Sequence, residues 1–244
     1  MDFLADIKTV ELVQVIFWFL AGAISFYFSI GNARVWTSIS TGFFLIFWSQ
    51  AYLLNPWVDY QRLAAIHYIL GTVAIMFMTH GFLEYYVFTR TLEVPGSKAS
   101  VYLTALAVIV LSTLFILINP VPKYSVLRNI RMIDNVNWVF LSIINLELIR
   151  KIYNEIHDSV IAKGFIAFGV VFFFIFLWKG SLLYLQVYLW DREWYEIFAY
   201  ATSTVELQEY SARIKFSEFV NQAAGILSGV SVGATFIYLY RLLR

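Results

Sequence analysis

Lys179 is the residue in this sequence whose chemistry is hardest to explain by packing alone. It lies within Gly164 to Trp190, GFIAFGVVFFFIFLWKGSLLYLQVYLW, and is the only charged residue there. At ~1.5 Å per residue this segment reaches ~40 Å, more than the ~30 Å hydrocarbon core of a bilayer. An ammonium at that depth costs at least ~2.5 kcal/mol to insert. Lys179 is therefore expected either to face other helices as part of a functional site, or to snorkel outward toward Tyr184 and Tyr188.

An interior Lys179 needs a partner, because an uncompensated buried charge is strongly destabilising. Glu84, Glu147 and Gln186 are the nearest candidates by depth, and Gln186 lies two turns away on the same helix face. Glu147 also has a local explanation, because Lys151 follows it by four residues and can pair with it on the helix surface. A polar or ligand site built from these residues is thus one hypothesis for this helix.

His80 and Glu84 form a second candidate site, because a spacing of four residues places both on one face of a helix. Such a pair could relay a proton or hold a transition metal. A metal site needs at least three ligands and only two are visible, so a hydrogen-bonded pair at the membrane interface is the alternative. His67 is a further weak metal candidate on the same helix.

His67 and His80 also suggest haem, which transmembrane histidines can hold. At ~100° per residue their side chains point about 140° apart around the helix, so one face cannot carry both. A bis-histidine haem site would therefore need its second axial ligand from a partner chain or a dimer.

Small residues form the sharpest local pattern near the end of the chain, where Gly225, Gly229 and Gly233 lie in GILSGVSVG. In lipid, close helix association depends on small residues that let two backbones approach each other. This glycine face is predicted to be a packing interface. Its partner is either a helix of the same chain or another subunit.

The composition identifies the solvent of the protein as lipid. Hydrophobic residues make up 61% of the 244 positions and charged residues 14%, against roughly 25% charged in soluble domains. The net charge of +1 gives no reason to expect a nucleic-acid partner. The sequence contains no cysteine, which excludes cysteine ligation of metals and cysteine nucleophiles. The first apolar run follows acidic residues and is interpreted as a retained helix, not a signal peptide.

Apolar runs bounded by charges and prolines predict an all-α integral membrane protein, a bundle of seven transmembrane helices with no soluble domain. The predicted spans are 10–31, 35–55, 63–86, 100–119, 132–153, 163–190 and 217–241. Span 132–153 is the weakest, because its uncharged core is short and contains asparagines, and a six-span bundle is the alternative. Its apolar residues point in every direction, which favours a buried helix. The connection 191–218 is predicted to be helical and partly continuous with the last span.

Three functions fit this sequence. The first is an integral membrane subunit or scaffold, without catalytic activity of its own, that assembles with partner chains or as a homo-oligomer. The second is an electron- or proton-transfer component that binds haem or quinone. The third is a small-solute transporter or channel that uses Lys179, although no repeat of two halves is visible in the sequence. The expected location is a plasma or inner membrane, and the distribution of Lys and Arg leaves the orientation open.

Overall fold

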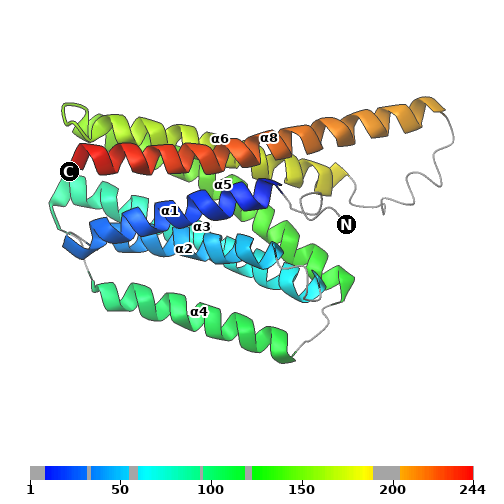
Figure 1. Ribbon diagram of the computed structural model, residues 1–244, viewed down its shortest axis with the longest axis horizontal. Coiled ribbons are helices and arrows are strands. Elements are labelled where there is room, and N and C mark those ends of the chain that lie inside the picture. The colour runs from blue at the N-terminus through cyan, green and yellow to red at the C-terminus, as the bar shows by residue number, and fades with distance from the viewer. Residues whose placement is uncertain are drawn as a thin grey trace.

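The computed structural model describes residues 9–31, 34–54, 60–93, 96–118, 123–188 and 204–243. Over these ranges the chain forms seven α-helices and no strand (Figure 1). The helices are α1 (Thr9–Gly31), α2 (Val35–Leu53), α3 (Tyr60–Thr91), α4 (Lys98–Ile118), α5 (Tyr124–Ile156), α6 (Ala162–Tyr188) and α8 (Thr204–Leu243). The prediction of an all-α membrane bundle is confirmed.

Six of these helices are long and apolar enough to cross a membrane. They include α5, the helix whose crossing the sequence left open. The remaining helix, α2, has 19 residues and carries several Ser and Thr side chains as well as Gln50. It packs along both α1 and α3, and its polar side chains are largely buried between them. We infer that α2 crosses with its neighbours, because burial among helices removes its polar groups from contact with lipid.

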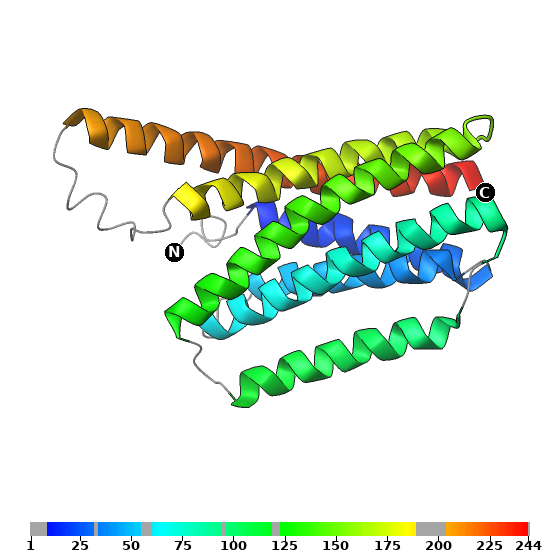
Figure 2. The same ribbon diagram turned by 180° about the vertical axis from the view of Figure 1, so that it is seen from behind.

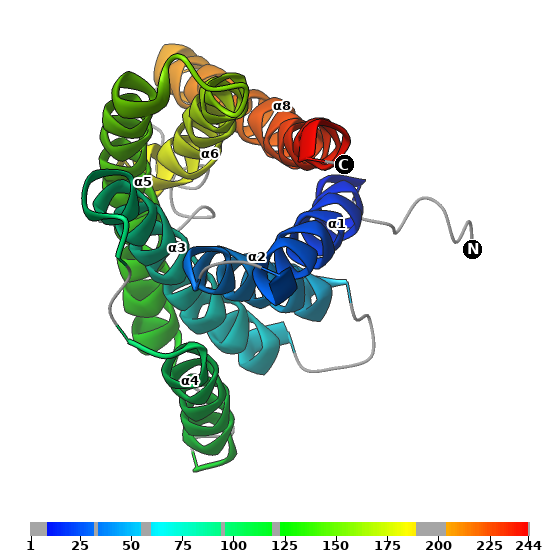
Figure 3. The ribbon, with the colours of Figure 1, turned by 90° about the vertical axis from the view of Figure 1, so that its left-hand side faces the viewer.

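The helices form a closed ring. Going round it, each helix contacts the next in the order α1, α2, α3, α5, α6, α8, and α8 returns to α1. Viewed along the bundle, the ring is seen end-on with α4 outside it (Figure 3). Among the described elements α4 packs along α2 and α3, and its first residue, Lys98, donates a hydrogen bond to the Ser29 carbonyl oxygen of α1. From behind, α4 stands apart from the remaining helices (Figure 2).

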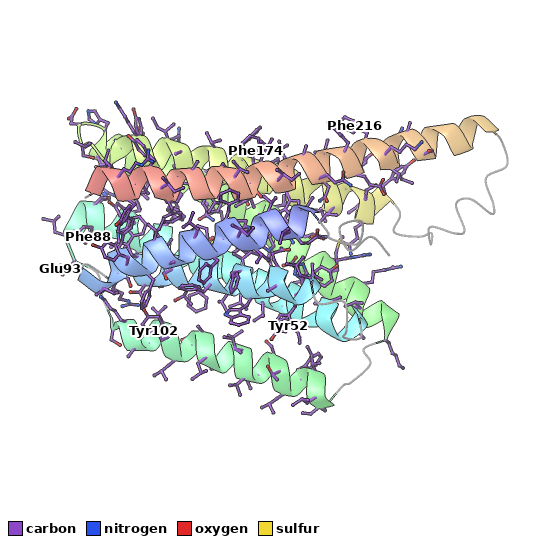
Figure 4. The ribbon with its side chains drawn as sticks, in the orientation of Figure 1. Tyr52, Phe88, Glu93, Tyr102, Phe174 and Phe216 are labelled. Carbon is purple, nitrogen blue, oxygen red and sulfur yellow. The ribbon has the colours of Figure 1, made fainter. Side chains whose placement is uncertain are left out.

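Most of α4 faces outward. Its buried residues are Val101, Ala105, Ser112 and Ile116, which follow one helical stripe. Large apolar side chains cover much of the rest, and Tyr102 is among those that project from its ribbon (Figure 4). An apolar helix of this length that buries only one narrow stripe fits a position at the lipid-facing edge of the bundle.

Aromatic rings fill the centre of the ring. Phe43, Phe82, Phe168, Phe172 and Phe236 are all fully buried and belong to α2, α3, α6 and α8. Four edge-to-face contacts connect them, with ring centroids between 5.1 and 5.4 Å apart. This aromatic cluster joins helices from opposite sides of the ring.

Several predicted boundaries differ from those observed. Helix α3 extends at both ends beyond the predicted 63–86, and α5 beyond 132–153. The connection predicted over 191–218 is described only from residue 204, where it is helical and continuous with the last span. Its earlier part lies outside the described residues, as do all four prolines that marked the predicted boundaries.

Candidate functional site

Lys179 lies inside the bundle and is paired with Asp134. The Lys179 Nζ atom is 2.8 Å from Asp134 Oδ2, and the two side chains are 1% and 0% exposed. Nζ also lies 4.6 Å from the ring centroid of Trp178 and 5.5 Å from that of Trp138. A carboxylate and two aromatic faces thus surround the ammonium, which compensates for its removal from water.

The second oxygen of Asp134 is held by α3. Thr72 donates its hydroxyl hydrogen to Asp134 Oδ1 over 3.1 Å. Beside it, a Cβ added to Gly71 would lie 2.9 Å from Oδ1 and 3.4 Å from the indole nitrogen of Trp138. Helix α3 can approach the carboxylate this closely because residue 71 has no side chain. The ion pair therefore joins α3, α5 and α6.

The partners expected for Lys179 from sequence were wrong, and so was the snorkelling alternative. Glu147 lies on the outer side of α5, where its carboxylate accepts a hydrogen bond from Arg150 over 2.8 Å and lies 3.8 Å from Lys151. Glu84 pairs with Arg34. Asp134 was overlooked because it marked the end of an uncharged run, although a buried lysine calls for a carboxylate at any matching depth.

Gln186 joins the same two helices nearer their ends. Its side-chain oxygen accepts a hydrogen bond from Asn135 over 2.9 Å, and its side-chain nitrogen donates to the carbonyl oxygen of Arg128 over 3.0 Å. Gln186 thus joins α6 to α5 at Asn135, the residue that follows Asp134 in the sequence. Its contacts are those of an interhelical hydrogen-bonded group.

A cavity of about 530 Å³ lies beside Lys179, near the end of the ring where α1 and α3 begin. Residues of α1, α2, α3, α6 and α8 line it. Its polar lining includes Glu11, Gln14, Gln50, His67, Lys179 and Asn221. Cavities of this volume hold small organic molecules, and polar groups converging on such a space fix the orientation of a ligand.

Two glutamines in this cavity have unused hydrogen-bonding capacity. Gln14 donates to the carbonyl oxygen of Gly225 over 3.1 Å, but its Oε1 atom is buried and has no hydrogen-bond partner among the described residues. The Nε2 atom of Gln50 is likewise buried and has no hydrogen-bond partner among the described residues. A buried, unpaired polar atom costs roughly 1 to 3 kcal/mol, so each one invites an external partner.

His67 is held on the cavity wall by α2. The Ser49 hydroxyl lies 2.8 Å from His67 Nδ1 and donates to the His67 carbonyl oxygen over 2.9 Å. This fixes the ring in the cavity lining, about one helical turn from Gly71. His67 is therefore part of the Lys179 region.

The structure places His80 and Glu84 elsewhere, toward the end where α2 begins. Glu84 Oε1 lies 3.0 Å from Arg34 Nη2, and Ser38 donates to Glu84 Oε2 over 2.9 Å. His80 Nδ1 is 3.6 Å from Glu84 Oε2, and the His80 side chain is 49% exposed. Within the described ranges, no three His, Cys, Asp or Glu side chains come together as a metal site. His67 and His80 belong to separate groups.

The glycine face of α8 packs against α1 of the same chain. Added Cβ atoms at Gly225, Gly229 and Gly233 would meet Val10, Gln14 and Phe17 respectively, in order along α1. The close approach that these glycines permit is therefore used inside the chain. Helix α1 occupies the surface that a partner subunit would need.

Comparison of the chain with protein-family models gives no match, and comparison with curated proteins gives none either. The function of the site is therefore inferred from its geometry.

Proposed function

We propose that this membrane protein binds a small polar solute in the cavity beside Lys179 and belongs to the transporter class. The observation that carries the proposal is a fully buried Lys179–Asp134 pair whose lysine lines a polar cavity inside a closed ring of helices. Ionisable residues inside a membrane bundle are costly and commonly mark the path of a substrate or an ion. Packing alone gives no reason for a 530 Å³ polar space at this position.

The cavity lining favours a zwitterion. Lys179 and the unpaired Nε2 atom of Gln50 are donors, suited to a carboxylate. The unpaired Oε1 atom of Gln14 and the carboxylate of Glu11 are acceptors, suited to an ammonium. Asp134 already balances the charge of Lys179, and the ammonium of a zwitterion can pair with Glu11 while its carboxylate meets the donors of Lys179 and Gln50. A small amino acid has this chemistry.

Thermal unfolding of the detergent-solubilised protein tests this proposal. The full chain would be melted alone and with amino acids, with simple amines, with simple carboxylates and with sugars. A solute present at a hundred times its Kd should stabilise the protein by about 2.7 kcal/mol. We expect this shift with at least one small amino acid and smaller shifts with the other classes.

Glu11→Gln should weaken the stabilisation by the amino acid, because Glu11 lines the cavity. Glu93→Gln is the matched control, because Glu93 is exposed in the turn after α3. Melting curves that no solute moves, or equal solute shifts in the two variants, would contradict the proposal.

Assembly with partner chains stays a prediction. The surface that would serve it is the outer face of α4, which lies outside the ring and packs along α2 and α3. Its apolar side chains suit a hydrophobic helix of a partner as well as lipid. The mass of the detergent-solubilised protein measured by light scattering tests it, and a mass of one chain would contradict it.

Haem or quinone binding also stays a prediction. His67 is the histidine that lines the Lys179 cavity, where a second axial ligand would have to come from another chain. A Soret band in the purified protein would support haem binding.

A further inference from the structure

We propose that the ring consists of two structurally equivalent three-helix units, α1–α3 and α5–α8, and that the Lys179 cavity lies on the pseudo-two-fold axis between them. Helices α1, α3, α5 and α8 run one way along the bundle, and α2 and α6 run the other way (Figure 1, Figure 2). Exchanging α1 with α5, α2 with α6 and α3 with α8 leaves the order of neighbours round the ring unchanged. Helix α4 is then the connection between the two units.

Burial follows the same exchange. With one constant shift in residue number for each pair of helices, many buried positions of one unit fall on buried positions of the other. The matched buried pairs are Ile39/Phe168, Phe43/Phe172, Ile46/Ile175 and Ser49/Trp178 in α2 and α6, Ala74/Ser228, Met78/Val232 and Phe82/Phe236 in α3 and α8, and Trp18/Ser142, Ala21/Asn145 and Ser25/Ile149 in α1 and α5.

Two glycines give the most specific correspondence. A Cβ at Gly71 of α3 would meet Asp134, Trp138 and Ser49, at 2.9, 3.4 and 3.6 Å. A Cβ at Gly225 of α8 would meet Val10, Gln14 and Trp178, at 2.7, 3.4 and 3.3 Å. The shifts that match burial convert the first set of neighbours into the second, residue by residue. Equivalent glycines therefore allow a close approach at the α3–α5 and α8–α1 junctions, where the two units meet.

The aromatic cluster repeats in the same way. Phe43 and Phe236 lie 5.1 Å apart at an interplanar angle of 87°. Their equivalents, Phe172 and Phe82, lie 5.4 Å apart at 84°. Each pair joins the middle helix of one unit to the last helix of the other, so the contacts cross the ring in both directions.

The sequence retains a trace of the repeat. Residues 43–47 of α2 read FFLIF and residues 172–176 of α6 read FFFIF, and each motif is followed at the same distance by Leu-Leu. The expectation that the sequence contains no repeat of two halves therefore needs correction. Charges and polar residues differ between the halves, which hides the similarity.

The cavity lies where an axis between the units would pass. Its lining contains four residues of the first unit, Gln50, Leu53, His67 and Tyr68, together with their equivalents in the second, Lys179, Leu182, Asn221 and Gln222. In bundles built from two repeats, solute sites form at the interface of the repeats. Gln50 is thus the counterpart of Lys179 and supplies the second half of the site.

This assignment of Gln50 rests on the proposed function. In the second unit the polar position carries an ammonium held by Asp134. In the first unit the residue equivalent to Asp134 is Val10, so Gln50 has no carboxylate beside it from that position, and its Nε2 atom has no partner among the described residues. One half of the site therefore carries a charge that Asp134 balances, while the other half is neutral and has an unpaired donor for the solute.

A charge transplant tests the repeat in the full chain, without reference to any solute. Gln50→Lys should lower the melting temperature, because the position equivalent to Asp134 is Val10 and supplies no carboxylate to the new ammonium. Adding Val10→Asp should restore at least half of that loss, because it reproduces the arrangement of Lys179 with Asp134. Adding Leu12→Asp is the matched control, because Leu12 lies on the outer face of α1. Equal melting temperatures for the two double variants would overturn the repeat.

Gln50→Leu tests the ligand role. The variant should fold normally, because it removes an unpaired polar atom, and it should bind the stabilising amino acid about tenfold to a hundredfold more weakly. Unchanged affinity would overturn the assignment of Gln50. If no solute binds the wild-type protein, the ligand role fails together with the proposed function, while the charge transplant still decides whether the two units are equivalent.

Discussion

Two ion pairs among the described residues, Lys179–Asp134 and Arg34–Glu84, connect helices, and their surroundings differ. Lys179 and Asp134 are enclosed by the ring and lie beside a polar cavity. Arg34 and Glu84 join α2 to α3 near the rim, with exposed fractions of 14% and 9%, and Arg34 also lines an apolar groove of about 400 Å³ against α4. The first pair faces the interior and the second faces the outer helix. The same chemistry thus serves a candidate site in one place and helix attachment in the other.

Removal of the Lys179 charge should have the largest effect. Lys179→Met leaves Asp134 as a fully buried, uncompensated carboxylate, at a cost of roughly 3 to 5 kcal/mol. Thermal unfolding in detergent measures this loss. Lys179→Met/Asp134→Leu removes both charges and should recover most of the stability. If Lys179→Met alone were as stable as the wild-type protein, the interior pair would not differ from the rim pair in its contribution to stability.

Arg34→Met should cost less, about 1.5 to 3 kcal/mol. Its partner Glu84 keeps the hydrogen bond from Ser38 and lies next to His80 at the rim, so the carboxylate is not left isolated. The same melting assay checks this value. A loss of stability as large as that of Lys179→Met would show that Glu84, like Asp134, is left without compensation when its basic partner is removed.

Gly71→Ala should cost about 1 to 3 kcal/mol, because the new methyl group would press against Asp134. Gly180→Ala is the matched control in α6. A Cβ at Gly180 meets no atom of another described element within 4 Å. That variant should be neutral or slightly stabilising, since alanine favours helix over glycine. Equal effects at the two sites would contradict the close approach of α3 to the ion pair.

Glu147→Gln should have the smallest effect, with no measurable change in melting temperature. Its carboxylate pairs with Arg150 and Lys151 on an exposed face, and such pairs contribute little. A large loss of stability would indicate that Glu147 supports the interior after all.

Composition and periodicity predicted the seven helices, because a spanning helix must be long and apolar. They also predicted that Lys179 needs a partner. They could not identify Asp134 as that partner. Asp134 lies between Arg131 and an uncharged run, which is the pattern expected at the end of a membrane span. Its position opposite Lys179 depends on the crossing of α5 and α6, which local patterns do not encode.

The glycine face illustrates the same limit. Its small residues predicted close packing, but only the arrangement of the helices shows that α1 is the partner. Gln14 and Gln50 were not predicted as site residues. Gln50 is a polar residue late in an apolar span, and that position is the signal that could have identified it.

The central claim is that the ring encloses a solute site built around Lys179. Its most direct test is the solute-induced rise in melting temperature, compared between the wild-type protein and Lys179→Met/Asp134→Leu. The double variant should fold but lose the charged half of the site. We predict that a small amino acid raises the melting temperature of the wild-type protein and leaves that of the double variant unchanged. Equal rises in both proteins, or no rise in either, would contradict the claim.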